Sequence, residues 1–175
     1  MNEAAVPEDD ALHGAEAIAP ARATLDRIGI PSLPWARGWA TVELDRAEQE
    51  VSRAFARHGS AVVSDAPDDD LLEARCRLLD FGGGSFRVVL LEPSAEGRLA
   101  ATLVRFGEGF VAHYVVVPDL DGFGAATGLE LSREGRGPFG RQRLVARGPA
   151  WGAHLLLTGN GAATVARPRS ATIGP

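Results

Sequence analysis

Apolar and polar residues follow two periods along the chain, which predicts a mixture of short strands and short amphipathic helices. The segment 87–114 shows both. It begins as the apolar strand Val88–Leu91, which ends at Pro93 because proline has no N–H to donate to a sheet ladder. A second strand, Val111–Val117, begins at the end of the segment and continues beyond it. Between the two strands, apolar residues recur at the spacing of one helix face, at Leu99, Leu103 and Phe106.

The same patterns predict a strand, a helix and three further strands in the first half of the chain. In order, these elements are Gly38–Leu44, a helix from Asp45 to His58, Ala61–Val63, Glu73–Phe81 and Ser85–Leu91. An acidic loop is expected at Ser64–Asp70. Gly82–Gly84 supplies the positive φ angles of a tight turn between the last two strands.

A similar plan follows in the second half. After Val111–Val117 we expect a short or irregular helix, a short strand, a loop and two paired strands, at Asp119–Gly128, Leu129–Leu131, Gly135–Gly140, Arg141–Arg147 and Ala153–Thr158. The segment Ala74–Pro93 aligns without gaps on Gly140–Gly159, and Glu43–Asp45 aligns on Asp119–Asp121. The sequence therefore predicts two copies of a strand–helix–three-strand module.

The ends of the chain differ from this repeat. Residues 1–34 are acidic at the start and interrupted by prolines, so we expect an extension that is partly disordered and holds a possible helix. The first module with its connecting helix is expected at 35–106, the second module at 107–160, and a flexible tail at 161–175.

Composition narrows the classes of function. Acidic residues outnumber basic ones by 23 to 18, which argues against nucleic acid or an anionic membrane as partner. The one cysteine, Cys76, excludes an internal disulfide and a cysteine-based zinc cluster. No apolar run reaches the roughly 20 residues of a membrane span. We therefore expect a soluble, cytoplasmic protein.

Short motifs in this order resemble the vicinal oxygen chelate superfamily, which includes glyoxalases, bleomycin resistance proteins and dioxygenases. The resemblance covers roughly 35–160 and is carried by LDRA at 44–47, LLEP at 90–93, EGRLA at 96–100, GEG at 107–109 and VPDLD at 117–121. It implies an α+β fold in which two βαβββ modules form a curved, partly open mixed sheet around a cavity. It also implies a homodimer.

Relatives in this superfamily hold one divalent metal with His, Glu or Gln from the first and last strand of each module. Placed in register, those positions fall at Ala36 and Ala112 on the first strands, and at Val89 and either Leu155 or Leu156 on the last strands. None of these side chains can bind a metal. The resemblance therefore predicts a protein without the metal ligands, and we expect no cofactor.

The candidate catalytic residues are His113, His154, Tyr114 and Glu43. Each histidine is a possible general base or a buried, hydrogen-bonded core residue. Tyr114 has the parity of the absent metal position, so it either points into the cavity or packs in the core. Glu43 is an acid–base group or a solvent-facing carboxylate.

The candidate substrate-binding residues are Arg87, Arg143, Trp39 and Trp151. The arginines suit a carboxylate or an oxyanion, and the tryptophans suit a planar ligand; exposed arginines and packed tryptophans are the alternatives. The function that we predict is a metal-independent, glyoxalase-like enzyme of isomerase, cyclase or epimerase type. It would act on a small organic intermediate, such as an intermediate of natural-product synthesis. The alternative is a non-catalytic binding protein that sequesters a drug, as bleomycin resistance proteins do.

Overall fold

The fold was analysed in a computed structural model that describes residues 36–84, 86–146 and 154–159. The first half comprises β1 (Ala36–Ala40), α3 (Leu44–Ala54), a 3₁₀ turn η1 (Ala56–His58), β2 (Ala61–Asp69), β3 (Ala74–Phe81) and β4 (Phe86–Pro93). The helix α4 (Arg98–Phe106) connects the halves. The second half comprises β5 (Gly109–Val117), α5 (Phe123–Thr127), β6 (Gly135–Gly137), β7 (Gly140–Leu144) and β8 (His154–Gly159).

The described strands form one mixed sheet in the order β2-β3-β4-β1-β5-β8-β7-β6. The first strand of each half pairs in parallel with the last strand of the same half, as β1 with β4 and β5 with β8. The two halves join where β1 and β5 run antiparallel, with Arg37 opposite His113. This arrangement confirms the α+β class and the two βαβββ modules.

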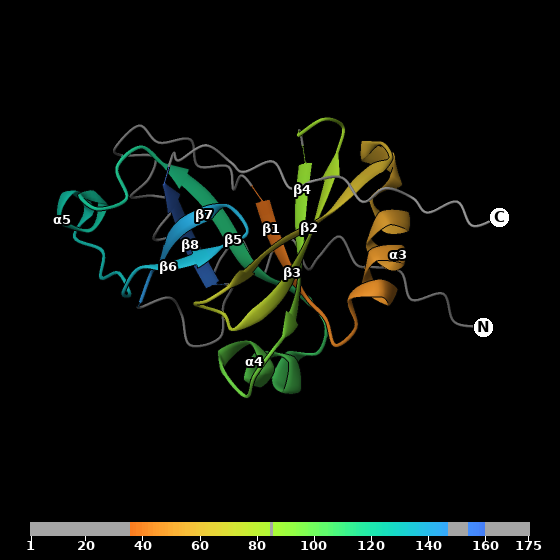
Figure 1. The fold of residues 1–175 in the computed structure, drawn as a ribbon, viewed down its shortest axis with the longest axis horizontal. Helices are drawn as coiled ribbons and strands as arrows, with labels where there is room; N and C mark the ends of the chain where they lie inside the picture. The colour runs from red at the N-terminus through yellow and green to blue at the C-terminus, as the bar shows by residue number, and fades with distance from the viewer. Residues whose placement is uncertain (1–35, 85, 147–153, 160–175) are drawn as a thin grey trace.

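The sheet curls until its outermost strands nearly meet. At this seam the backbone N–H of Asp70 donates to the carbonyl of Arg136 at 2.9 Å, and the N–H of Arg136 donates to Asp70 Oδ2 at 3.0 Å. Curling leaves one concave and one convex face. α3 and α5 lie at opposite sides of the molecule, with β1 and β5 between them (Figure 1).

The buried apolar residues separate by face. A cluster shared by both halves fills the concave side and includes Val89, Leu91, Ala112, Tyr114 and Leu156, together with Leu99 and Leu103 of α4. The convex side carries two separate clusters, one under α3 and one beside α5. At the centre of the concave face a Cβ added to Gly38 would lie 2.7 Å from that of Ala112, so the strands meet there through small residues.

Helix α3 is fixed to the sheet by apolar and ionic contacts. Its residues Ala47 and Val51, four apart, are buried against β3 and β4. Beside them, the almost fully buried Arg77 of β3 donates to Asp45 and Glu48 at 2.7 Å each. Two carboxylates thus compensate the burial of one guanidinium. None of the described helices is long and apolar enough to cross a membrane.

Three local expectations were wrong, all at the edges of the sheet. The expected loop Ser64–Asp70 belongs mostly to β2, and β6 lies inside the expected loop Gly135–Gly140. Leu129–Leu131 contributes only an isolated bridge from Leu131 to Val145. An edge strand pairs on one side only, so it tolerates polar residues and glycine that obscure its pattern.

The gapless repeat also needs one correction. In the first hairpin Leu78 pairs with Val89, whereas in the second Leu144 pairs with Leu156. The second hairpin is therefore one residue longer. Leu156, and not Leu155, is the concave counterpart of Val89.

Candidate active site at the seam

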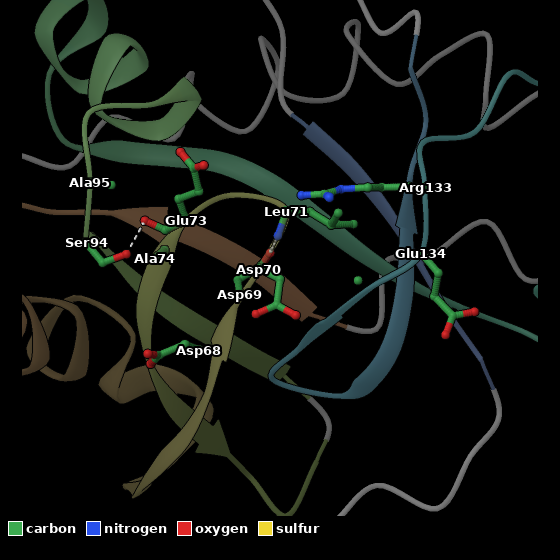
Figure 2. A pocket seen from close by; sticks show the side chains of 11 residues that line it. Asp68, Asp69, Asp70, Leu71, Glu73, Ala74, Ser94, Ala95, Arg133 and Glu134 are labelled. Atoms are coloured by element: carbon green, nitrogen blue, oxygen red, sulfur yellow. Dashed lines mark hydrogen bonds between the residues drawn. The ribbon is translucent and has the colours of Figure 1, made fainter.

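A pocket of about 520 Å³ opens at the seam, beside the packed concave core. Its walls come from three segments far apart in the sequence: the β2–β3 turn, the residues that follow β4, and the residues that precede β6 (Figure 2). Curling of the sheet brings the first and last of these segments together. This pocket therefore lies at the rim of the sheet.

Carboxylates dominate the pocket. Asp68, Asp69, Asp70, Glu73 and Glu134 line it, and Arg133 is the one basic side chain among the lining residues that the structure describes. Such a surface carries a negative potential. The pocket therefore favours a neutral or cationic ligand group over phosphate or carboxylate.

The carboxylate of Asp69 is buried and accepts three hydrogen bonds from within the protein. Asp69 is 1% exposed, and its Oδ1 accepts the backbone N–H groups of Leu71 and Leu72 at 3.0 and 2.9 Å. Its Oδ2 accepts the hydroxyl proton of Tyr114 at 2.9 Å. Burial raises the pKa of Asp69, and burial together with the nearby Asp69 charge raises the pKa of Tyr114 well above its usual value. The pair therefore acts as an internal brace for the β2–β3 turn.

Glu73, at the end of that turn, differs from Asp69 because its side chain is exposed. Its φ of 55° lies in the left-handed region, which is uncommon for a residue other than glycine. Two hydrogen bonds hold its carbonyl in this conformation, from the N–H of Ser94 at 2.8 Å and from Ser94 Oγ at 2.9 Å. Strained backbone that surrounding contacts maintain is a frequent feature of functional sites.

The Glu73 side chain is exposed and lies against Gly97, where its carboxylate leaves no room for a Cβ. Gly97 is the N-cap of α4 and offers no side-chain cap of its own. A carboxylate at this end of a helix is favoured by the helix dipole. Among the described residues none donates a hydrogen bond to it. Glu73 thus presents an exposed carboxylate to the pocket from a backbone whose conformation is held by hydrogen bonds.

The two candidate histidines lie on opposite faces of the sheet. His154 pairs with Ala112 and faces the concave side, whereas His113 pairs with Arg37 on the convex side. Burial lowers the pKa of each to about 4, helped by the charge of Arg37 near His113 and of Arg98 near His154. Both are therefore neutral imidazoles near pH 7, and they do not form one site.

The other candidates are dispersed. Arg87 donates to Asp80 Oδ2 at 2.9 Å, and Arg143 donates to the carbonyl of Ser132 at 3.2 Å. Glu43 is exposed at the start of α3, 3.8 Å from Arg46.

Trp39 packs edge-on against Phe110 with ring centroids 5.0 Å apart, and Trp151 lies outside the described residues. None of the described candidates lines the seam pocket, so their roles as site residues stay predictions. Sequence reasoning missed Asp69 and Glu73 because the acidic run 65–70 indicated only a solvated loop, and neither a seam nor a left-handed φ leaves a sequence signal.

The four positions at which the resemblance implies metal ligands carry no donor atoms. Ala36, Ala112, Val89 and Leu156 belong to the concave cluster at the positions expected for ligands, and alkyl side chains offer no donor atom. In the parts of the chain that the structure describes, no group of three or more His, Cys, Asp or Glu residues is placed to hold a metal ion.

Comparison with known proteins places the fold. A scan against protein-family models found no match, and a search of curated proteins found none either. Among solved structures, the chain is similar to methylmalonyl-CoA epimerase from Mycobacterium tuberculosis, with a TM-score of 0.59 and 22% identity over 72% of this chain and 86% of that one.

Two further structures give the same result. The epimerase from Streptomyces coelicolor in complex with 2-nitronate-propionyl-CoA has a TM-score of 0.56 and 22% identity, over 73% of this chain and 96% of that one. A hypothetical protein from Bacillus halodurans C-125 has a TM-score of 0.56 and 14% identity, over 74% and 94%. The chain therefore shares the fold of the methylmalonyl-CoA epimerases.

Proposed function

We propose that the protein is a metal-independent isomerase that moves a proton on a small organic substrate held in the seam pocket. The observation that carries the proposal is Glu73, whose exposed carboxylate lines a cavity of about 520 Å³ from a turn held in a left-handed backbone conformation. The fold shared with epimerases supports a reaction of this type.

In this proposal Glu73 removes a proton from a carbon next to a carbonyl group and returns it, while Arg133, the one basic side chain among the described lining residues, offsets the negative charge that develops on the carbonyl oxygen. A positioned carboxylate contributes roughly 10²–10⁴-fold to such a step. Asp69 and Tyr114 act as positioning residues, because their hydrogen bond holds the turn that carries Glu73. Each step is assigned to side chains of this chain, and none requires a metal.

The acidic walls set a condition on the substrate. With five carboxylates and one arginine among the described lining residues, the pocket repels an additional negative charge. The solved epimerases include complexes with CoA compounds, whose phosphates would be unfavourable here. We therefore propose a neutral or amine-bearing substrate for this chain.

A second candidate function is binding without turnover. The saturated hydrogen bonding of Asp69 favours it, since a carboxylate that already accepts three hydrogen bonds serves structure better than proton transfer. The two candidates differ in what Glu73 does. An enzyme needs its carboxylate for turnover, whereas a binder needs only the shape and charge of the pocket.

Deuterium exchange separates the two. The full chain is incubated in D₂O with a panel of 2-substituted amides, esters and amino ketones, and incorporation is followed by mass spectrometry. For at least one compound we expect exchange at the carbon beside the carbonyl, and a fall of at least about 100-fold in Glu73→Gln. Glu50→Gln, an exposed carboxylate change on α3, is the matched control and should keep the wild-type rate.

Exchange that survives Glu73→Gln at the wild-type rate would remove Glu73 from the mechanism. Binding of a panel compound without any exchange, equal in wild type and Glu73→Gln, would instead support the sequestering protein.

A further inference from the structure

Arg37 and His113 face each other across the central strand pair of the sheet. They are direct partners in the β1–β5 register, on the convex face. This position lies between the apolar cluster under α3 and the one beside α5, so neither helix is centred on it (Figure 1). The seam pocket belongs to the rim of the sheet and does not include either residue.

His113 is buried without a hydrogen-bond partner. Its side chain belongs to a residue that is 6% exposed, and neither Nδ1 nor Nε2 has a partner. Its neighbours on this face are Arg37, Leu155 and Val115, of which only Arg37 is charged. Leaving a buried polar group unpaired is unfavourable, because the group gives up its hydrogen bonds to water and gains none in return. A native protein that keeps such a group usually has a ligand, an ion or a water for it.

Arg37 is half-buried and also lacks an acidic partner among the described residues. Its guanidinium lies 5.5 Å from the ring centroid of Phe110 and 6.0 Å from that of Phe86. Arg77, also on the convex side, shows the usual solution, because two carboxylates accept its hydrogen bonds. Rings can stack on a guanidinium, but they leave its N–H donors unused.

We propose that Arg37 and His113 form a binding site for the carboxylate of a small ligand with an apolar body. The planar guanidinium of Arg37 donates two parallel hydrogen bonds to the carboxylate, and the neutral imidazole of His113 donates a third. The half-buried rings of Phe86, Phe110 and Trp39 contact the apolar body. The site selects an anion, whereas the seam pocket selects against one.

The probe for this site is benzoate, with benzamide as its uncharged counterpart. Binding to the full chain is followed by NMR through the ring protons of His113, together with a direct titration of the dissociation constant. We expect benzoate to raise the pKa of His113 by about one unit or more, because a bound anion favours the imidazolium form. Benzamide should leave the pKa unchanged.

Arg37→Gln should weaken benzoate at least tenfold, whereas Arg53→Gln, which removes an exposed charge from α3, should not change the affinity. Should Arg37→Gln fail to fold, Arg37→Lys keeps the charge without the planar fork and should weaken benzoate severalfold.

Three outcomes would overturn the proposal. One is a His113 pKa that does not respond to benzoate, and another is equal affinity in wild type and a folded Arg37 variant. The third is a His113 pKa in the ligand-free chain that falls when Glu8, Asp9 and Asp10 are neutralised together. That result would assign the site to the chain's own acidic N-terminal segment instead of a separate ligand.

Discussion

Asp69, Tyr114 and His113 are all almost completely buried, but they differ in how their polar atoms are satisfied. Asp69 and Tyr114 hydrogen-bond each other at the seam, whereas His113 has no partner at either nitrogen. The first two residues thus stabilise the turn that carries Glu73. The imidazole of His113 instead remains without a hydrogen-bond partner. The free energy cost of burying it depends on whether it is protonated, so the stability of the protein should depend on pH.

We predict that His113 makes the protein less stable in mild acid. Its pKa is about 4 in the folded state and 6.5 in an ordinary environment, so the unfolded chain takes up a proton first. The stability that the neutral form contributes is complete above pH 6.5 and is lost as the pH falls from 6.5 through 4. At about 1.4 kcal/mol for each unit of pKa, the loss is at most about 3–4 kcal/mol.

Urea unfolding at several pH values measures this loss. Stability of the His113→Leu variant should fall less between pH 6.5 and 4 than that of the wild type. Asp69, whose pKa is raised, gives the opposite trend, but it is common to both proteins and drops out of the difference. Parallel curves for the two proteins would show that His113 is not buried in its neutral form.

Sequence patterns identified the polar residues of the strands and gave Tyr114 the parity of the absent metal position, and the structure places it with those positions on the concave side. His113 and Tyr114 are adjacent and necessarily point to opposite sides. The pairing of Tyr114 with Leu156 of the concave cluster places His113 on the convex side. No sequence pattern around Arg37, which stands between Ala36 and Gly38, indicated a functional role for it. Its importance follows only from the register that sets it opposite His113.

At the scale of elements, α4 links the seam pocket to the concave core. Its N-terminal end at Gly97 meets the side chain of Glu73, and its residues Leu99 and Leu103 are buried in the cluster that both halves share. Val104, on the other face of the helix, is 90% exposed. The helical spacing of apolar residues predicted the helix and the burial of Leu99 and Leu103 correctly, because that signal is local. Phe106, which was expected on the same buried face, is 56% exposed at the end of the helix.

We predict that Leu99→Ala destabilises the protein by about 2–5 kcal/mol, because Leu99 is 0% exposed and the truncation leaves a cavity in the shared core. Val104→Ala, on the same helix, is the matched control and should change stability by less than about 0.5 kcal/mol. Chemical denaturation of both variants provides the comparison. Equal effects would mean that α4 does not pack against the concave face as described.

At the scale of the whole molecule, the internal repeat made the fold predictable. Two matching runs of residues indicated two modules, and the similarity to epimerase structures agrees with them. The seam was not predictable, because it joins Asp70 to Arg136 through contacts distant in sequence. The candidate site lies at this seam, so the sequence predicted the fold but did not indicate the pocket. The homodimer implied by the resemblance stays a prediction.

We propose that this protein transfers a proton in the seam pocket without a metal. The most direct test of this proposal is the deuterium exchange rate of protein treated with EDTA, compared with untreated protein and with Glu73→Gln. We predict that EDTA leaves the wild-type rate unchanged while Glu73→Gln loses at least about 100-fold. Exchange that EDTA abolishes and added Co²⁺ or Mg²⁺ restores, with Glu73→Gln still active, would contradict the account.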